Sequence, residues 1–350
     1  MPSRPNLAAV AAKAGVAAST ASLAFSDSPR VASATRAKVL AAAAELGYTG
    51  PNPLAASLRR GRSGVVGAFV GERLLYAFRD PVAVHLLDGI AEVLGDAGVG
   101  LLLMPGEAGR PTTEQIGRIP LDAVVFATCG LESDPDLERL RSRGVPIVAV
   151  EGPASAGVVL VDIDDRRGTR ELAEHVRDLG HRRVEVVTMP LRLDRTRGDV
   201  DSDRRAMPHY RDVQSRLDGV EDVFGSVPAY ETASNALTEG EEAGRALLDR
   251  PEDRRPTAVL AQSDVLAAGV LRAAERLRLR VPEDVSVVGF DGADLHWLAP
   301  QRLTTVVQPT AEKGRTAARS AVDLIEGRQP SDVTLPVTLR VGTTSGPPPK

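Results

Sequence analysis

From Val65 onward the chain alternates short apolar runs with amphipathic segments, and this alternation limits its possible folds more than any other feature. Valine-rich runs such as VVGAFV at 65–70 and DAVVFA at 122–127 are typical of strands buried in a parallel sheet. Most are followed by a segment with helical spacing of its apolar residues. A succession of strand, helix and strand predicts a mainly parallel sheet that is covered by helices on both faces.

The pattern predicts eight strands, near 65–70, 100–104, 122–127, 146–150, 158–161, 184–188, 257–261 and 285–289. It predicts helices at about 81–97, 134–143, 168–179, 204–217, 240–249, 264–276 and 310–326. So many units exceed one sheet, and two similar α/β lobes are therefore expected. Folds of this class bind ligands where loops meet at the carboxyl ends of the strands.

Composition narrows the class of protein. With 43% hydrophobic and 26% charged residues, the chain is typical of a globular protein, and no run of about 18 apolar residues could cross a bilayer. The first residues, MPSRPNLAAVAAKAG, contain no uninterrupted apolar segment of a secretory signal, so we expect a cytoplasmic protein. The single cysteine, Cys129, excludes an intrachain disulfide and a cysteine-rich zinc module.

Enzymatic motifs are missing from the sequence. It has no phosphate-binding Gly-x-x-x-x-Gly-Lys loop, no His-Glu-x-x-His zinc site and no Gly-x-Ser-x-Gly nucleophile turn. Gly95, Gly98 and Gly100 follow a helix instead of joining a strand to a helix, which is the wrong context for a dinucleotide. We therefore expect no enzymatic activity, no metal and no cofactor.

The charge of the chain is unevenly distributed. Residues 1–64 carry eight basic side chains against two acidic ones, a net charge of +6, although the whole chain has a net charge of −4. A basic segment joined to an acidic body suits attraction to a polyanion, because each neutralised phosphate releases counterions. A solvated basic arm without a partner is the alternative.

Three short helices are predicted in this basic segment. Asn6 is a good N-cap for a helix from Leu7 to Ala14, which Gly15 ends. A second helix is expected from Thr20 to Phe25, and a third from Ser33 to Leu46, capped by Ser33 and stopped by Gly47. The first pair predicts a helix-turn-helix.

Small side chains dominate the stretch GVAASTASLAF at 15–25. A helix that lies in the major groove of DNA needs a slim outer face, and hydroxyl groups bond phosphates or base edges while apolar groups contact thymine methyls. An alanine-rich hairpin without any ligand has the same spacing. If DNA is bound, the candidate contacts in this stretch are Ala18, Ser19, Thr20, Ser22 and Leu23, together with Asn6 before the first helix.

The stretch from Leu7 to Gly64 resembles the DNA-binding headpiece of the LacI family of bacterial transcriptional regulators. The matching pieces are VAAKAGV at 10–16, the residues Thr20 and Ser22, the run VASATRAKV at 31–39, and LGY at 46–48 with Asn52. Ala17 departs from the pattern, because the family carries a serine there, and the loss of a serine cap costs about 1 kcal/mol of helix stability.

The resemblance implies a hinge in PLAASLRR at 53–60. In the family this segment forms a short helix when a dimer meets its operator, and a leucine enters the minor groove. By position that leucine is Leu58, with Ala55 beside it and Arg59 near the phosphates. Because such a wedge stabilises only a bent, symmetric complex, the resemblance implies a homodimer on a near-palindromic operator.

The remaining chain is similar to the effector domain of the same family, whose fold is shared with periplasmic sugar-binding proteins. The resemblance lies in residues 164–184, 256–292 and LTTVVQP at 303–309. It implies four parts: a helix-turn-helix headpiece at 1–48, a hinge at 49–62, a two-lobed effector-binding and dimerisation domain at 63–342, and a tail at 343–350.

The resemblance and the strand ends together give six candidate effector contacts: Phe78, Arg205, Ser263, Asp264, Asp291 and Trp297. Asp291 ends a strand and matches a family residue that accepts hydrogen bonds from ligand hydroxyls. Asp264 has a helix cap as its alternative role, and Trp297 has ordinary packing. Arg205 is one position from the family's arginine, which is Ala206 here.

The sequence thus predicts a repressor that binds double-stranded DNA as a homodimer and responds to a small ligand, a sugar or related polyol, bound between the lobes. Whether the ligand releases the protein from DNA or promotes binding stays open. The rival interpretation is a small-molecule-binding module or α/β enzyme whose N-terminal helices serve only interaction.

Overall fold

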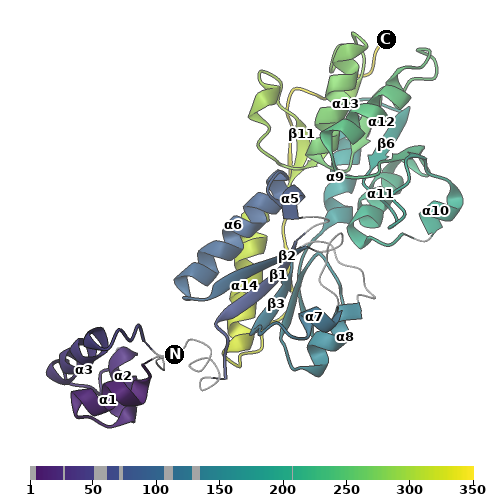
Figure 1. The fold of residues 1–350 in the computed structure, drawn as a ribbon. Helices are drawn as coiled ribbons and strands as arrows, with labels where there is room; N and C mark the ends of the chain where they lie inside the picture. The colour runs from purple at the N-terminus through teal and green to yellow at the C-terminus, as the bar shows by residue number, and fades with distance from the viewer. Residues whose placement is uncertain are drawn as a thin grey trace. The chain divides into compact units, whose positions relative to one another are not determined.

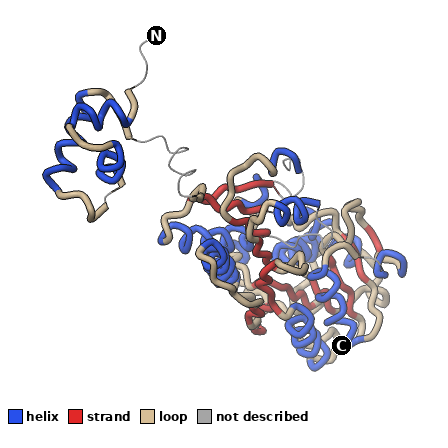
Figure 2. Tube along the Cα trace, turned by 90° about the horizontal axis from the view of Figure 1, so that it is seen from below, coloured by secondary structure: helices blue, strands red, loops and turns tan. Residues whose placement is uncertain are grey.

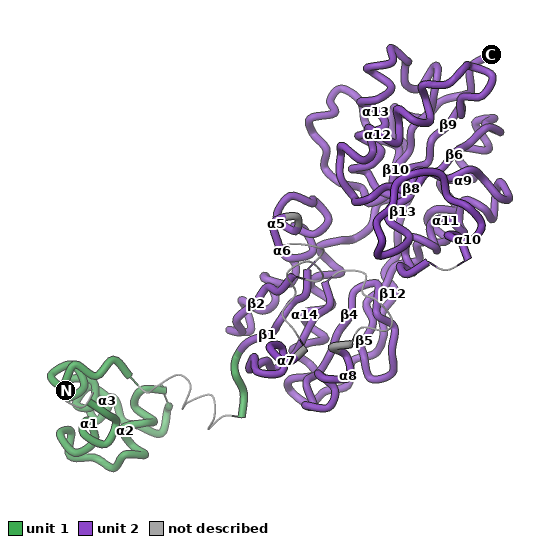
Figure 3. Tube along the Cα trace, turned by 45° about the vertical axis from the view of Figure 1, so that its right-hand side comes forward, with its two compact units in different colours: residues 1–64 green, residues 65–350 purple. Residues whose placement is uncertain are grey.

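A computed structural model describes residues 5–26, 28–50, 61–70, 74–105, 113–127, 135–206 and 208–350. The chain divides into two units, residues 1–64 and residues 65–350, which Figure 3 draws in green and purple.

The first unit is a three-helix bundle of α1 (Leu7–Ala14), α2 (Ala18–Phe25) and α3 (Ser33–Glu45). Each helix buries small or branched side chains, and the fully buried Val10, Ala21 and Val39 come from all three. The predicted caps of α1 are present. Asn6 Oδ1 accepts a hydrogen bond of 3.0 Å from the amide of Ala9, and Gly15 has a φ of 65°.

Two details of this unit differ from the prediction. Helix α2 begins at Ala18 instead of Thr20, so it also includes the exposed small residues Ala18 and Ser19. The predicted cap at Ser33 is wrong, because Ser33 is already the first helical residue and Ala32 is the N-cap, with no side-chain hydrogen bond. Thr20 and Ser33 therefore lie within regular helix.

The second unit contains two sheets, as the strand and helix pattern predicts. The first sheet has six parallel strands in the order β12-β5-β4-β3-β1-β2. We call this part the N-terminal lobe. Its strands are β1 (Val65–Val70), β2 (Gly100–Pro105), β3 (Ala123–Phe126), β4 (Ile147–Val150), β5 (Val158–Ile163) and β12 (Val333–Leu335); its helices are α5 (Leu74–Ala77), α6 (Pro81–Asp96), α7 (Thr113–Ile116), α8 (Pro135–Ser142) and α14 (Thr310–Ile325).

The second sheet has seven strands in the order β13-β11-β10-β9-β6-β8-β7, and only the edge strands β13 and β7 pair antiparallel. We call this part the C-terminal lobe. Its strands are β6 (Val184–Thr188), β7 (Gly198–Asp199), β8 (Ala229–Glu231), β9 (Ala258–Ala261), β10 (Ser286–Asp291), β11 (Thr304–Val307) and β13 (Thr338–Arg340). Its helices are α9 (Asp165–Asp178), α10 (Ser202–Ala206), α11 (Arg211–Phe224), α12 (Leu237–Leu248), α13 (Asp264–Arg276) and the 3₁₀ helix η1 (His296–Leu298).

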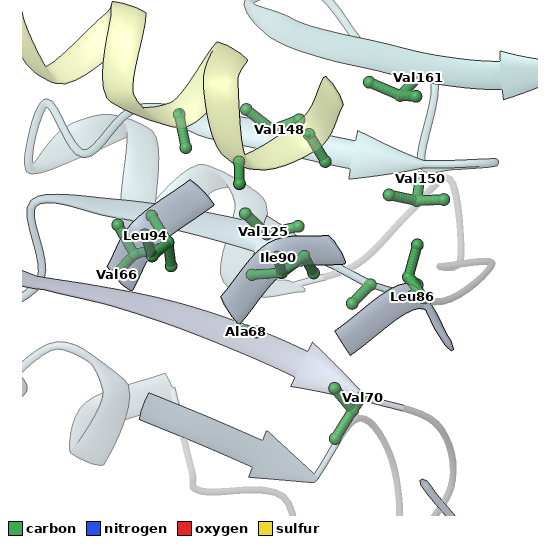
Figure 4. Close-up of a cluster of buried hydrophobic side chains, with 14 of the residues drawn as sticks. Val66, Ala68, Val70, Leu86, Ile90, Leu94, Val125, Val148, Val150 and Val161 are labelled. Carbon is green, nitrogen blue, oxygen red and sulfur yellow. The ribbon is translucent and has the colours of Figure 1, made fainter. Parts of the chain in front are cut away.

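In both lobes the strands run through the interior and helices flank them (Figure 2). The core of the N-terminal lobe shows why: strand β1 contributes Val66, Ala68 and Val70, and helix α6 contributes Leu86, Ile90 and Leu94 on one face (Figure 4). These three strand residues are two positions apart, so they lie on one face of the sheet. The three helix residues are four positions apart, so they lie on one face of the helix. Each period therefore gives one continuous buried surface.

The chain crosses three times between the lobes: from β5 to α9, from β11 to α14, and from β12 to β13. The second crossing returns α14 to the N-terminal lobe, where it lies beside α6 (Figure 1). Two glycines permit this close approach. A Cβ on Gly89 would lie 2.1 Å from the carbonyl oxygen of Ala311, and one on Gly314 would lie 2.1 Å from that of Leu86.

The predicted helix at 204–217 is wrong. The structure has a short α10 that ends at Ala206 and a separate α11 that begins at Arg211. Pro208 lies between them, and proline lacks the amide hydrogen that a continuous helix requires. Five strands were not predicted, namely β7, β8, β11, β12 and β13; none exceeds four residues, too few for a clear periodic pattern.

The segment expected to be a tail, 343–350, is partly integrated into the C-terminal lobe. The carbonyl oxygen of Thr344 accepts a hydrogen bond of 2.8 Å from the amide of Val287 in β10. The Nε2 atom of buried His181 lies 2.8 Å from the carbonyl oxygen of Gly346. Since a carbonyl oxygen can only accept, Nε2 is the donor of this hydrogen bond. This segment therefore differs from a free tail.

Among the described residues, no single helix has the length and apolar character needed to span a membrane. Helices α1 and α2 are long and apolar enough only when they are taken together, and their axes bend by 104° at the break between them.

Candidate DNA-binding face and ligand cavity

Helix α2 presents a slender outer face. Ala18 and Ser19 are exposed, and Leu23 is 36% exposed, whereas Ala21 and Ala24 on the opposite side are buried against the bundle. Thr20 and Ser22 are half-buried between the two faces. The small buried alanines allow α2 to pack closely, and the exposed side chains are short enough for a groove.

The start of α2 lacks a side-chain cap. Ala17 is its N-cap and offers no hydrogen bond to the first turn, as the departure from the family's serine implies. Asn6 uses its Oδ1 atom to cap α1, so its side chain has a clear structural role beside the predicted DNA contact.

Two of the basic side chains in this unit have local partners. Lys13 lies 2.7 Å from a carboxylate oxygen of Glu45, and Arg36 donates from Nε to the carbonyl oxygen of Ala24 over 3.1 Å. The second contact ties α3 to the end of α2. The predicted hinge contacts Ala55, Leu58 and Arg59 lie outside the described residues.

A cavity of about 220 Å³ lies between the two lobes of the second unit. Its walls include the residues at or directly after the carboxyl ends of five strands: Ala127 after β3, Glu151 after β4, Met189 after β6, Asp291 at the end of β10, and Gln308 after β11. This is the location that the fold class predicts for a ligand.

The wall of the cavity combines aliphatic and polar side chains. The apolar part of its wall is aliphatic, with Ala77, Val82, Ala83, Leu86 and Val213. The polar part consists of the acidic Asp80, Glu151, Asp212 and Asp291, the basic Arg195, Arg216 and Lys313, and the neutral Tyr210, Ser234, Asn235 and Gln308. Such a wall accepts and donates many hydrogen bonds at once.

Asp291 is the one predicted effector contact that lines this cavity. It has a positive φ of 122°, and its Oδ1 atom accepts a hydrogen bond of 2.7 Å from Nε2 of Gln308. Burial raises the pKa of the Asp291 carboxyl well above its ordinary value, an effect that the nearby Arg216 opposes and Asp264 increases. Its position at the end of β10 follows directly from the strand pattern.

A buried polar network joins the lobes at the cavity. Lys313, on α14 and 1% exposed, donates to Glu151 over 2.8 Å and also to Oε1 of Gln308. Gln308 in turn holds Asp291. The network therefore runs from the N-terminal lobe across the second crossing into the C-terminal lobe.

Arg216 extends this network on the opposite wall. Its Nε donates to Asp165 over 2.7 Å, its guanidinium lies 3.8 Å from the ring centre of Phe290, and NH1 lies 3.7 Å from Asp291. Burial raises the pKa of Asp165 to about 7, although the charge of Arg216 opposes the rise. Arg216 thus positions two carboxylates from different elements.

The other predicted effector contacts do not line the cavity. Arg205 donates to Glu221 and to the carbonyl oxygen of Val227, so it stabilises the fold around α10 and α11. The arginines at the cavity are Arg195 and Arg216, one on the loop after β6 and one within α11.

Ser263 and Asp264 lie behind the cavity wall. Ser263 is the N-cap of α13, since its Oγ accepts from the amide of Leu266 over 3.1 Å, and it donates to Asn235, which does line the cavity. Asp264 is fully buried and accepts from Thr305 Oγ1 over 2.6 Å and from the amide of Ala293 over 2.7 Å. The expected alternative role of Asp264 as a cap belongs to Ser263.

The side chains of the two aromatic candidates, Trp297 and Phe78, are exposed. Trp297 in η1 is 45% exposed and its ring centre lies 5.3 Å from the guanidinium of Arg272. Phe78, after α5, is 61% exposed, and its neighbour Ala77 lines the cavity instead. Neither aromatic ring supplies a stacking surface in the cavity.

Several cavity residues were not predicted from the sequence, among them Asp80, Glu151, Arg216, Gln308 and Lys313. A signal existed for three of them. Glu151 and Gln308 directly follow strands, and Asp80 precedes a proline at the start of a helix, which is typical of an N-cap. Lys313 and Arg216 lie inside helices, where no local pattern marks a functional side chain.

Comparison with known proteins agrees with this architecture. The profile of the lacI family of bacterial regulatory proteins matches residues 6–52, and that of the periplasmic binding protein-like domain matches residues 173–345. An HTH-type transcriptional regulator of Mycolicibacterium smegmatis is 35% identical over 99% of this chain and 98% of its own length.

Solved structures are similar over nearly the whole chain. A LacI family transcriptional regulator from Corynebacterium glutamicum has a TM-score of 0.73 and 27% identity, covering 97% of this chain and 98% of that one. A complex of the regulator CelR with cellobiose has a TM-score of 0.67 and 29% identity, covering 97% of this chain and 100% of that one. The chain therefore belongs to the LacI family of DNA-binding transcriptional regulators, with a helix-turn-helix unit and a periplasmic-binding-protein-like domain.

Proposed function

We propose that this regulator is a homodimeric repressor whose affinity for its operator is controlled by a small polyol in the cavity between the lobes. The observation that carries the DNA-binding half is the exposed face of α2, where Ala18, Ser19 and Leu23 stand on a segment with a net charge of +6. Slim side chains fit a major groove, and the flanking cations bind phosphates.

The hinge supplies the second part of the proposed DNA contact. Leu58 inserts into a central minor-groove step, with Ala55 beside it and Arg59 on the phosphates, and two copies of the hinge meet at the dyad of a near-palindromic operator. Asn6, Thr20 and Ser22 complete the contacts of the headpiece. The protein acts in the bacterial cytoplasm, where its DNA target lies.

The ligand half of the proposal rests on the wall of the cavity. Asp291, Asn235 and Gln308 are hydrogen-bonding groups suited to hydroxyls, and the four lining carboxylates make the wall rich in acceptors. The cellobiose bound by the relative CelR supports a carbohydrate ligand. A volume of about 220 Å³ lies below the ~300–1,000 Å³ typical of drug-sized ligands, which favours a ligand of about monosaccharide size.

Control of DNA binding follows from the crossings between the lobes. A ligand that contacts Glu151 on one lobe and Asp291 on the other binds one arrangement of the lobes better than another, and so shifts the population. The same differential affinity works in either direction, so both an inducer and a corepressor remain compatible with it.

Selection of bound duplexes from a random pool, followed by a gel-shift titration, tests the proposal. We expect a near-palindromic site whose affinity falls at least about 10³-fold between roughly 50 and 200 mM salt. Ribose, glucose, sorbitol and cellobiose are then added to the complex in turn. An absence of sequence preference at moderate salt, with and without these compounds, would refute the proposal.

The rival, a ligand-binding module whose N-terminal helices only contact another protein, makes a different prediction. It requires no selected sequence and no steep salt dependence, while ligand binding in the cavity persists. The same titration therefore separates the two functions.

A further inference from the structure

Among the residues that the structure describes, the wall of the cavity contains more acidic than basic groups. Four carboxylates line it, from Asp80, Glu151, Asp212 and Asp291, against three cationic side chains, from Arg195, Arg216 and Lys313. Two of the cations already hold acids, since Lys313 bonds to Glu151 over 2.8 Å and Arg216 bonds over 2.7 Å to Asp165, which does not itself line the cavity. Acidic groups are therefore in excess in the described part of the wall.

Two helices that begin at the cavity have an acidic residue at their N-terminus. The start of a helix is a favourable place for a phosphate or carboxylate, because its first amides lack partners. At α6 the carboxylate of Asp80 takes this place and accepts from the amide of Val82 over 2.9 Å. At α11 the buried Asp212 stands in the first turn. A ligand anion would compete with both.

Asp80 and Asp291 reach the cavity from opposite lobes. Burial raises the pKa of each. The charge of Lys313 opposes this rise at Asp80; at Asp291 the charge of Arg216 opposes it, whereas Asp264 and Asp80 raise the pKa further. The two carboxylates thus repel each other through the space that the ligand enters. Hydroxyl groups would donate hydrogen bonds to them, an ammonium group would offset their charge, and an anion would add to the repulsion.

We propose that the cavity admits uncharged and amino-bearing polyols but excludes their phosphorylated and carboxylated derivatives, and that Asp80 sets this selectivity. The inference rests on the proposed function, because it specifies the ligand of the same cavity. Asp80 is suited to the role because the hydrogen bond that holds its carboxylate comes from a backbone amide, that of Val82, and not from a lysine or arginine side chain.

Calorimetric titration of the full chain tests this with matched sets of compounds. One set is glucose, glucosamine, glucose 6-phosphate and glucuronate; another is ribose and ribose 5-phosphate; a third is sorbitol and sorbitol 6-phosphate. In the set that binds, we expect each anionic member to bind at least about 100-fold more weakly than its neutral parent, and glucosamine to bind no more weakly than glucose.

The variant Asp80→Asn locates the selectivity. Asparagine keeps an oxygen that accepts from the amide of Val82, so α6 remains capped while the charge is lost. We expect the ratio between neutral and anionic members to fall to less than about tenfold. Asp96→Asn makes the same chemical change at the exposed end of α6 and should leave the ratio unchanged. Thermal unfolding of both variants verifies the fold.

The outcomes are distinct. An anionic member that binds as tightly as its neutral parent overturns the inference, even if it releases operator and so supports the proposed function. An unchanged ratio in Asp80→Asn removes Asp80 from the role. Failure of every neutral and amino compound to bind overturns the polyol assignment, whereas loss of sequence-specific DNA binding with intact selectivity overturns only the proposed function.

Discussion

The ammonium group of Lys313 lies 2.8 Å from the carboxylate of Glu151, and this pair fixes helix α14 to the carboxyl end of β4 beside the cavity. Lys313 is 1% exposed, so it also depends on Gln308 for a second acceptor. Because α14 follows directly from the second crossing between the lobes, the pair connects the cavity wall to the segment that a change in lobe arrangement would move.

Lys313→Met should lower the free energy of unfolding by about 3 kcal/mol, since the Glu151 side chain, only 10% exposed, then loses this cation. Urea denaturation of the full chain measures the change. Adding Glu151→Gln should restore a large part of the loss, because the uncompensated charge is removed. Equal stability of Lys313→Met and the original protein would show that the pair contributes nothing.

Asp264 gives a pH dependence with a definite sign. Burial raises its pKa from 3.8 to about 7, so the folded protein holds a proton that the unfolded chain has already released in this range. Stability should therefore fall as pH rises from about 4 to about 7 and then level off. In Asp264→Asn this decline should be shallower, which thermal unfolding across the range would reveal; an identical slope would contradict the prediction.

Gly314→Ala should destabilise the N-terminal lobe by about 1–3 kcal/mol, because the new methyl group would lie 2.1 Å from the carbonyl oxygen of Leu86 and force α14 away from α6. Gly95→Ala is the matched control on α6. Nothing lies within 4 Å of a Cβ there, so alanine's better helix propensity should leave stability equal or higher. Denaturation midpoints of the two variants should move in opposite directions.

Removal of residues 343–350 should destabilise the C-terminal lobe. It leaves the amide of Val287 and the buried ring of His181 without the carbonyl oxygens that they bond, and a buried group without its partner costs about 1–3 kcal/mol. A shorter deletion of 347–350 keeps these bonds and serves as control. Comparable thermal midpoints for the two truncations would argue that the segment is only an appendage.

Leu58→Ala should abolish preference for the selected operator while much of the nonspecific binding remains, because the wedge is lost but the cations stay. Gel-shift titrations with operator and scrambled duplexes measure both affinities. Leu54→Ala makes the same chemical change in the same segment, at a residue that is not a predicted DNA contact, and serves as the control. Undiminished operator affinity in Leu58→Ala would exclude the proposed wedge.

The family and the general architecture could be predicted from the sequence because they depend on local patterns. The valine-rich strands, the cap at Asn6 and the left-handed turn at Gly15 each follow from a few neighbouring residues. The helix expected at 204–217 is interrupted for a local reason as well, since Pro208 lacks the amide hydrogen that a continuous helix requires. Asp291 could be predicted as a residue of the cavity because the end of a strand can be identified without knowing what surrounds it.

What the sequence determined by itself is the order of strands and helices, the basic N-terminal segment and the membership of the chain in its family. Only the tertiary structure decided which polar side chains share the cavity. Lys313 in α14, Glu151 after β4 and Arg216 in α11 are far apart in the chain, and they meet because the packing of the two lobes brings these segments to the walls of one cavity. Arg205 does not line the cavity, because its guanidinium is held by Glu221 and by the carbonyl oxygen of Val227. No local sequence pattern predicts these two contacts.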